Sequence, residues 1–560
     1  MKRFRFLPVS LSLWLANVAS LAMVGSFSWQ SWLYAQAPQN PTLQIGIVQR
    51  FGRDDAETLI VQPLTGDQIT LQFKTGDQVE TLNTNQVTLD TALKELATVS
   101  LREWVVLSTH RSFESAEDSA YQWQQRGIET EIAQPDNWQV WAKRDVYHTP
   151  FLRRLLHKAL REAGHQDVFI DSRLLQSAPQ AAAIANGFRY NRSVVSITTQ
   201  NQRVRVIRKV GDREESVRTY GGNLRLQPNA YGTYTLVNLV PIETYLQGVV
   251  PYEIGLGAPP TTIEAQAILA RTYVLRNLRR FAVDGYELCA DTQCQVYRGL
   301  SGAAAVTDRA ITATQGLVLT YQNELVDALY SSNAGGVTAA FSHVWNGPDR
   351  PYLQPVVDSV IGSWDLSQRP LHDEAHLKAF LALDSGFNEE TWDTFRWQTN
   401  SSLLEITQDL KEYLQIRQHP LSNFSEVKRL VVTERAASGR VQTLQVATDL
   451  GIVTLEKDEV IRALSAPLSL LFYTEGLYQT PPGATEPQIQ GYRFIGGGFG
   501  HGVGMSQTGA YNLGRLGWSN GRILQFYYPG TELQLISNQL VFWRDPYQKA
   551  DTEVPGTSSP

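Results

Sequence analysis

Short runs in which hydrophobic and polar residues alternate follow an apolar N-terminal stretch. They occur at residues 45–48, 59–61 and 69–73. Alternation with a period of two is typical of strands that bury one face. The pairs Gly66-Asp67 and Gly76-Asp77 are typical of turns. The pattern therefore predicts a small β region over residues 41–100.

The hydrophobic period changes twice between residues 101 and 175. Two stretches with helical spacing, 112–125 and 151–163, separate four strand-like runs at 104–107, 129–132, 138–141 and 168–170. The predicted order is strand, helix, strand, strand, helix, strand, which is the order of ferredoxin-like modules. In element order alone it resembles the sporulation-related repeat (SPOR) module. That resemblance implies glycan binding, with candidate contacts at Trp138, Trp141, Arg153, Arg154 and Lys158.

Residues 176–545 mix both periods. Strands are predicted at 193–198, 204–210 and 234–239, and helices at 262–281 and 308–314. Residues 364–425 have an irregular pattern that indicates an insertion, and the tail 546–560 is predicted to be disordered. A chain of 560 residues exceeds one ordinary core. We therefore expect a multidomain α+β protein with one mixed α/β catalytic domain.

The N-terminus predicts export. Lys2, Arg3 and Arg5 precede an apolar stretch that runs to about residue 33, and Ala35-Gln36-Ala37 has the small-x-small pattern of a cleavage site. The apolar stretch is also long enough to span a bilayer. Residues 1–40 are therefore either a signal peptide or an uncleaved anchor. Both predict a periplasmic or envelope location, with membrane contact through this segment only.

Charge excludes one class of partner. Charged residues make up 19% of the chain, the net charge is −6, and no long Lys/Arg block follows the first few residues. Nucleic-acid affinity depends on clustered cations, so no nucleic-acid partner is expected. The 13 Trp and 23 Tyr residues fit core packing, or stacking on sugar rings.

Five patches in the same order resemble one known family, that of stage II sporulation protein D and the amidase enhancer (SpoIID/LytB). The patches are LVNLVPIETYLQGVVPYE (236–253), EAQAILARTY (264–273), QVYRG (295–299), YSSNAGGVT (330–338) and GGGFGHGVGMSQTGA (496–510). The resemblance implies activity on peptidoglycan. Sporulation members of the family are lytic transglycosylases, and its enhancer branch stimulates a cell-wall amidase.

The family's catalytic Glu falls at Glu253, where this chain has Tyr252 in place of the commoner small residue. Glycosidic cleavage needs an acid for the leaving oxygen, and hydrolases usually add a second carboxylate. A lytic transglycosylase manages with one Glu, because the 6-hydroxyl of muramic acid attacks the anomeric carbon. No paired carboxylate is evident around Glu253. The apolar residues 249–251 before it are expected to raise its pKa.

Several other residues are candidate substrate contacts. Arg271, in an Ala-rich helix, is expected to bind either the lactyl carboxylate of muramic acid or an internal partner, Glu243 or Asp291, because a buried cation needs one. Glu264 has capping-box spacing from Thr261. The Gly-dense loop around His501 permits close backbone approach, as a sugar-binding wall or as a structural turn. The resemblance extends the set of contacts to Gln295, Tyr297, Ser332, Thr338, Ser506 and Gln507.

Cys289 and Cys294 are close enough in the sequence for a local disulfide, half of a metal site, or two buried thiols. Some family members bind zinc with a His shortly before the Cys pair. No His lies between His165 and His343 here. We therefore expect a disulfide and no cofactor.

Three functions fit these observations. The first is a lytic transglycosylase that leaves 1,6-anhydro-muramic acid ends. The alternative is a non-catalytic, glycan-binding enhancer of an N-acetylmuramoyl-L-alanine amidase, and the third is a structural envelope protein. The presence of Glu253 favours the first.

Overall fold

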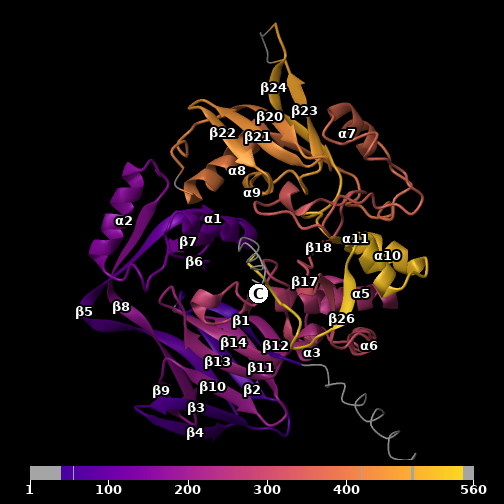
Figure 1. Ribbon diagram of the computed structural model, residues 1–560. Helices are drawn as coiled ribbons and strands as arrows, with labels where there is room; N and C mark the ends of the chain where they lie inside the picture. The colour runs from indigo at the N-terminus through magenta and orange to yellow at the C-terminus, as the bar shows by residue number, and fades with distance from the viewer. Residues whose placement is uncertain (1–39, 55, 418, 481–484, 546–560) are drawn as a thin grey trace, which may run out of the picture. The chain divides into compact units, whose positions relative to one another are not determined.

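The computed structural model describes residues 40–54, 56–417, 419–480 and 485–545 (Figure 1). The predicted signal or anchor, apart from Asn40, and the predicted disordered tail lie outside these residues. Within the described ranges, no helix has both the length and the hydropathy required to cross a bilayer. Helices and several β-sheets together confirm the predicted α+β class.

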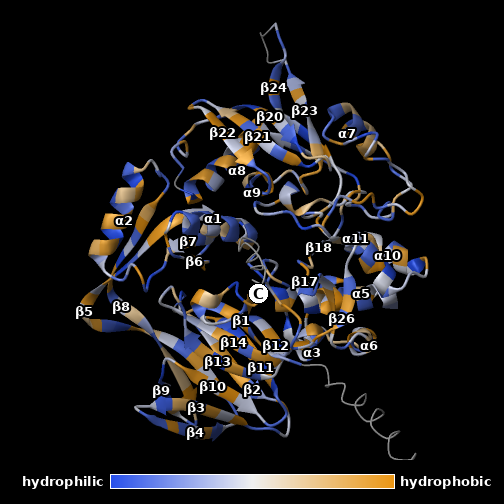
Figure 2. Cartoon of the chain, viewed as in Figure 1, coloured by the Kyte–Doolittle hydropathy of each residue, from blue (hydrophilic) through white to orange (hydrophobic). Residues whose placement is uncertain are grey.

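The strands of residues 41–100 are not a separate region. In the structure, β1 (Thr42–Phe51) pairs with β14 (Tyr234–Pro241), β2 (Glu57–Pro63) with β11 (Arg203–Val210) and β3 (Ile69–Thr75) with β10 (Val195–Thr199). Their alternating apolar side chains, such as Ile45, Leu59 and Leu71, are buried in one core with Val195 and Leu224. A strand with one apolar face needs a partner to cover it, and here the later strands provide it. Figure 2 shows the alternating hydropathy along these strands.

The strands form two large sheets. The seven-stranded sheet has the order β15 (Leu288–Cys289), β1 (Thr42–Phe51), β14 (Tyr234–Pro241), β13 (Asn223–Pro228), β10 (Val195–Thr199), β3 (Ile69–Thr75), β4 (Gln78–Thr84). The eight-stranded sheet follows β12 (Arg213–Gly221), β11 (Arg203–Val210), β2 (Glu57–Pro63), β5 (Val87–His110), β7 (Trp138–Ala142), β6 (Thr130–Ala133), with β8 (Phe169–Ala185) on β5 and β9 (Phe188–Asn191) on β8.

Residues 104–170 have the predicted element order. Helix α1 (Phe113–Gln125) begins after Ser112, whose side chain accepts a hydrogen bond from the N–H of Ser115 at 3.2 Å. Helix α2 (Pro150–Glu162) leads into β8. The strands β5 and β8 continue beyond the module as a long antiparallel ribbon, which joins it to the rest of the sheet.

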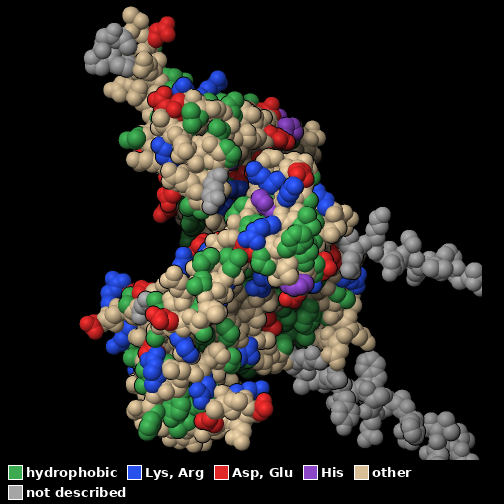
Figure 3. All heavy atoms as spheres, turned by 90° about the vertical axis from the view of Figure 1, so that its left-hand side faces the viewer, with side chains coloured by type: hydrophobic (Ala, Val, Ile, Leu, Met, Phe, Trp, Pro, Cys, Tyr) green, Lys and Arg blue, Asp and Glu red, His purple; other side chains and the backbone are tan. Residues whose placement is uncertain are grey.

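The basic side chains among the proposed glycan contacts of this module each lie near an acidic residue, and Arg154 and Lys158 remain largely exposed. Trp138 and Trp141 are both buried, and Arg153 and Arg154 both pair with the buried Glu103. Lys158, on exposed α2, lies 3.7 Å from Glu162. The face that carries α2 shows Lys and Arg interspersed with acidic and hydrophobic side chains (Figure 3).

Helix α5 (Pro260–Arg276) is buried along most of its length, and Ala265, Ala267 and Ala270 allow close packing around it. The predicted capping box is wrong. The helix begins at Pro260, a residue suited to the first helical position, and no side chain caps it. The carboxylate of Glu264 instead accepts a hydrogen bond from Asn520 at 2.8 Å. Around α5 lie α3 (Ile242–Gln247), α4 (Val250–Glu253), α6 (Ala305–Ala313), α10 (Gln507–Arg515) and α11 (Asn520–Tyr527).

The predicted insertion over residues 364–425 is not separate from the residues that follow it. Strand β19 (Trp397–Ser402) pairs with β24 (Gln488–Gly496), so that Trp397 is opposite Gly496. The chain before and after residue 425 is thus joined in one sheet. The elements of this part are α7 (Glu374–Leu381), β19 (Trp397–Ser402), α8 (Leu403–Ile416), β20 (Val427–Arg435), β21 (Val441–Thr448), β22 (Ile452–Glu456), α9 (Glu459–Ala463), β23 (Phe472–Gln479) and β24 (Gln488–Gly496).

The Gly-dense loop after β24 packs backbone against backbone. Gly498 and Gly504 have positive φ angles of 87° and 74°. A Cβ atom at either residue would overlap the carbonyl oxygen of Asn333 or Leu329. Short strands complete this region: β16 (Leu317–Tyr321) with β17 (Glu324–Leu325) and β26 (Glu532–Leu535), and β18 (Tyr330–Ser331) with β25 (Met505–Ser506). The two Gly-containing segments therefore pack directly against each other.

Candidate functional site

A cleft of about 440 Å³ contains Glu253. Segments distant in the sequence meet here: the start of α1, the end of α4, the disulfide loop, strand β18 and the Gly-dense loop. The lining residues are Arg111, Ser112, Phe113, Glu114, Trp138, Glu253, Tyr273, Arg280, Thr292, Gln293, Cys294, Val296, Leu329, Tyr330, Ser331, Ser332, Trp345, Arg462, Phe499, Gly500, His501 and Gln507.

Glu253 is the last residue of α4, and Gly255, two residues later, has a φ of 75°. Its carboxylate accepts a hydrogen bond from the N–H of Val296 at 2.7 Å and another from the hydroxyl of Tyr330. Burial raises the pKa of Glu253 to about 7, although both hydrogen bonds favour the charged form. The carboxyl group is therefore able to both donate and accept a proton near neutral pH.

Two glutamines form hydrogen bonds with groups next to the carboxyl group of Glu253. Gln295 is buried outside the cleft, where it donates to the hydroxyl of Tyr330 at 3.1 Å and accepts from Tyr245 at 3.1 Å. Gln507 lines the cleft and donates to the backbone oxygen of Glu253 at 2.9 Å. Gln295 thus positions Tyr330, and Gln507 positions the end of α4.

His501 and Ser332, two of the predicted contacts, line the cleft as well. The Nδ1 atom of His501 accepts the N–H of Val503 at 3.0 Å, and its ring lies 5.0 Å from that of Trp345. Burial lowers the pKa of His501 to about 4. Its imidazole is therefore neutral at neutral pH, with the proton on Nε2.

Three other predicted contacts, Tyr297, Thr338 and Ser506, do not line the cleft. Tyr297 is buried and donates to Asn238 at 2.7 Å. Thr338 is buried, bonded to Gln354 and Val356. Ser506 caps α10 and bonds the buried Glu389. Each of these hydroxyl groups forms a hydrogen bond inside the protein. The spacing of the motifs alone does not reveal that these residues are buried.

Arg271 pairs with an internal carboxylate. Its guanidinium is fully buried and makes two hydrogen bonds to Glu243, at 2.9 and 2.7 Å, and one to the carbonyl oxygen of Leu317 at 2.9 Å. Of the two roles open from the sequence, the geometry favours the internal partner. The pair joins α3, α5 and β16.

Cys289 and Cys294 form a disulfide, with their Cα atoms 5.7 Å apart. The closed loop and the residues after it contribute Thr292, Gln293 and Val296 to the cleft wall. The bridge therefore constrains the segment whose N–H binds the carboxylate of Glu253. Over the residues described, no cluster of three or more His, Cys, Asp or Glu side chains is placed to hold a metal ion.

Sequence reasoning missed the side of the cleft formed by distant segments. Glu114, at the start of α1, forms an ion pair with Arg280 at the cleft wall. Arg111 and Arg462 also line it. None of these residues lies in a motif, and only the packing of the module and of α9 near the turn after α5 brings them here.

Two segments of the chain match models of known protein families. A family model described as stage II sporulation protein matches residues 230–321, which include Glu253 and both cysteines. A model described as a domain of unknown function, DUF8618, matches residues 339–504.

Relatives of known name cover about half of the chain. The amidase enhancer of Bacillus subtilis (strain 168) is 29% identical over 361 residues, which are 57% of this chain and 48% of the enhancer. The chain thus spans about half the length of that relative. Stage II sporulation protein D of the same organism is 26% identical over 330 residues, 55% of this chain and 80% of the relative. That of Bacillus amyloliquefaciens is 25% identical over 313 residues, 53% of this chain and 75% of the relative. Residues 230–321 are therefore similar to the stage II sporulation protein family, and about half of the chain is similar to the amidase enhancer and to stage II sporulation protein D.

Proposed function

We propose that the protein is an exported lytic transglycosylase that cleaves peptidoglycan glycan strands during cell-wall remodelling. The observation that carries the proposal is the position of Glu253, a carboxyl group with a pKa near 7 at the wall of a cleft of about 440 Å³. The family relationship supports peptidoglycan as the substrate.

In the proposed reaction, the protonated Glu253 donates its proton to the glycosidic oxygen as the bond to the muramic acid C1 atom breaks. The Glu253 carboxylate then accepts the proton of the 6-hydroxyl as that oxygen forms a bond to C1. One proton leaves Glu253 and one returns, so the enzyme is regenerated and no water is consumed. The N–H of Val296 and the hydroxyl of Tyr330 stabilise the carboxylate between the two steps.

The rest of the wall suits a sugar chain. Trp345, Tyr273 and Phe499 offer aromatic surfaces, and Ser332 and Gln293 offer hydrogen-bonding groups. A strand of alternating apolar ring faces and hydroxyl groups matches such a wall.

A second carboxylate, Glu114, lines the cleft but is held by Arg280. Arg280 is almost fully buried, so release of Glu114 would leave a buried cation without its partner. This pairing supports the one-carboxylate scheme over hydrolysis with two.

The direct test is the chemistry of the products. Purified glycan strands incubated with the full chain and examined by mass spectrometry are expected to give fragments with 1,6-anhydro-muramic acid ends. These fragments are lighter by one water than the reducing ends a hydrolase leaves. Reducing ends alone would contradict the transglycosylase proposal.

We expect kcat/KM to be constant below about pH 7 and to fall tenfold per pH unit above it, because Glu253 must carry a proton to start the reaction. Tyr330→Phe should move the inflection to higher pH, since the lost hydrogen bond favours the charged form.

His501 stays neutral throughout this range. Asp458, outside the cleft, has a pKa that burial also raises to about 7, so Asp458→Asn is the matched control. An inflection that moves with Asp458→Asn rather than Tyr330→Phe would contradict the assignment.

The amidase enhancer relative supports one alternative, a glycan-binding protein that stimulates an amidase. In that case, the cleft binds strands without cutting them. Intact strands after long incubation, together with faster peptide release by an added cell-wall amidase, would favour this alternative.

A further inference from the structure

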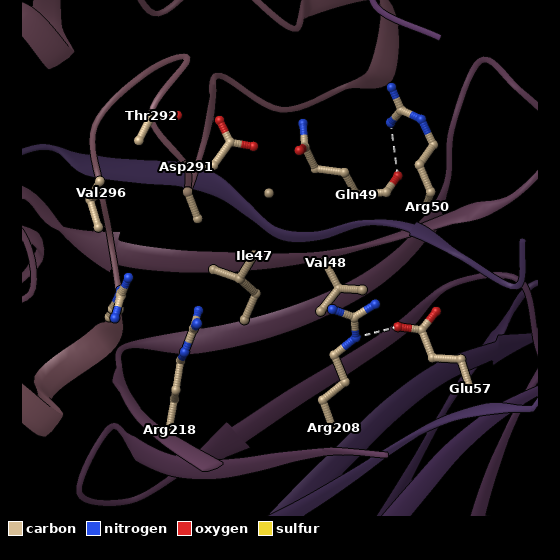
Figure 4. Close-up of a pocket in the computed structure, with 13 residues that line it drawn as sticks. Ile47, Val48, Gln49, Arg50, Glu57, Arg208, Arg218, Asp291, Thr292 and Val296 are labelled. Carbon is tan, nitrogen blue, oxygen red and sulfur yellow. Dashed lines mark hydrogen bonds and ion pairs between the residues drawn. The ribbon is translucent and has the colours of Figure 1, made fainter. Parts of the chain in front are cut away.

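A second pocket, of about 430 Å³ (Figure 4), shares part of its wall with the Glu253 cleft. Thr292 and Val296 line both spaces. The volume is within the roughly 300–1,000 Å³ of small-molecule sites. The family resemblance assigns nothing to this pocket, most of which is built from strands β1, β11 and β12.

Arginines dominate the pocket. Arg50, Arg208, Arg218 and Arg298 line it, against the two carboxylates Glu57 and Asp291. Figure 4 shows Arg208 and Arg218 extending from the lower strands toward Ile47 and Val48. The pocket thus has an excess of positive charge.

Two of the arginines have internal roles. Arg208 pairs with the buried Glu57 at 2.6 Å. Arg50 donates to the carbonyl oxygens of Gln49 and Gln134, and its guanidinium lies 4.0 Å from the ring centre of Tyr231. These contacts fix the shape of the pocket and use much of the hydrogen-bonding capacity of both side chains.

Arg218 and Arg298 differ, because neither forms an ion pair with any residue that the structure describes. Arg218 bonds the hydroxyl of Tyr220, and Arg298 lies over the ring of Tyr252, 5.4 Å from its centre. Tyrosine contacts hold a guanidinium in place without neutralising it. Two positioned and uncompensated guanidinium groups match the two oxygens of a carboxylate or phosphate.

The pocket is coupled to the catalytic carboxyl group through short connections. Val296, at the shared wall, donates its N–H to Glu253 at 2.7 Å. Tyr252, under Arg298, directly precedes Glu253. The pocket and the Glu253 cleft are therefore adjacent and share the segment that contains Thr292 and Val296.

We propose that Arg218 and Arg298 form a subsite for a carboxylate group carried by the muramic acid unit at the Glu253 cleft. The inference rests on the proposed glycan substrate. Two sources present the same chemistry: the free lactyl group of a strand without stem peptides, and a carboxylate of an attached stem peptide.

Calorimetry on the full chain carrying Glu253→Gln, which prevents turnover, tests the subsite. The probes are a denuded glycan tetrasaccharide, the same tetrasaccharide with its lactyl groups converted to neutral methylamides, and a peptide-bearing tetrasaccharide. The variant is Arg218→Gln with Arg298→Gln. Arg213→Gln is the matched control, since Arg213 lies on the same strand but is 79% exposed and outside the pocket.

The double variant is expected to weaken binding of a carboxylate-bearing probe by about tenfold or more, since each hydrogen bond to a charged group is worth that much. Binding of the neutral methylamide should stay the same, as should every value for Arg213→Gln. If the denuded probe alone is affected, the lactyl group is the ligand. If the peptide-bearing probe is affected instead, the ligand is a stem carboxylate.

Equal affinities of the double variant and its parent for both charged probes would overturn the subsite while leaving glycan binding intact. An equal loss for the neutral probe would also overturn it, because the change would then be structural. If the parent binds none of the three probes, the proposed function itself fails. Thermal unfolding of each variant checks that the fold is retained.

Discussion

Glu253→Gln is expected to reduce glycan cleavage by about 10²–10⁴-fold, the usual contribution of a general acid or base. Glutamine has nearly the same shape, and its oxygen can still accept the N–H of Val296. It has no proton to give to the glycosidic oxygen, and it cannot accept one from the 6-hydroxyl. The rate of release of 1,6-anhydro ends, followed by mass spectrometry, measures the effect.

The thermal stability of the same variant at different pH values tests the raised pKa of Glu253. The pKa of Glu253 is about 7 in the native protein, against an ordinary value of 4.5 for a glutamate. The native state thus binds this proton more tightly than the unfolded chain does, and stability is lost as pH rises from about 4.5 through 7. Glu253→Gln removes that loss, so its unfolding temperature should match the parent at pH 4 and exceed it at pH 8.

Glu264→Gln is the matched control for cleavage, because Glu264 is a carboxylate outside the cleft, bonded to Asn520. It should retain near-normal activity. Full activity in a well-folded Glu253→Gln protein would assign the acid to another residue, and Glu114 is the carboxylate in the cleft to examine next.

Arg271→Met is expected to lower the free energy of unfolding by about 3–5 kcal/mol, the cost of breaking a buried ion pair from one side. Arg271 is fully buried, and its loss leaves Glu243 without a cation and the carbonyl oxygen of Leu317 without its side-chain donor. Chemical denaturation measures the change.

Two further variants distinguish the contribution of the Arg271–Glu243 ion pair to stability from that of side-chain packing. Adding Glu243→Leu to Arg271→Met should recover part of the lost stability, because it removes the uncompensated carboxylate. Arg309→Met, at an exposed position on α6, should change stability little. If Arg271→Met unfolds no more easily than Arg309→Met, the pair does not stabilise the fold.

The hydrophobic periodicity of the sequence predicts most helices and strands, because each of these elements depends mainly on neighbouring residues. The alternation at 204–210 predicts β11 and the helical spacing after residue 260 predicts α5, within a few residues. Glu253 is predicted by a motif that lies in one continuous stretch. The pairing of β1 with β14, almost two hundred residues later, leaves no local trace. The pairing of Glu114 with Arg280 likewise depends on packing between distant segments. Arg271 shows the limit most clearly, because the same Ala-rich helix fits both a ligand contact and an internal ion pair.

The β5–β8 ribbon has a consequence for how this protein can vary. Trp104 is opposite Asp171 and Val106 is opposite Phe169, so the chain leaves the sheet and returns to it at adjacent points. A segment with neighbouring ends can be lengthened, exchanged or replaced by a short turn while the strands on either side keep their register. The module between residues 107 and 168 is in this sense a cassette. Its exchange would also take away Glu114, so a replacement cassette must bring a carboxylate for Arg280 or leave that guanidinium open to ligands in the cleft.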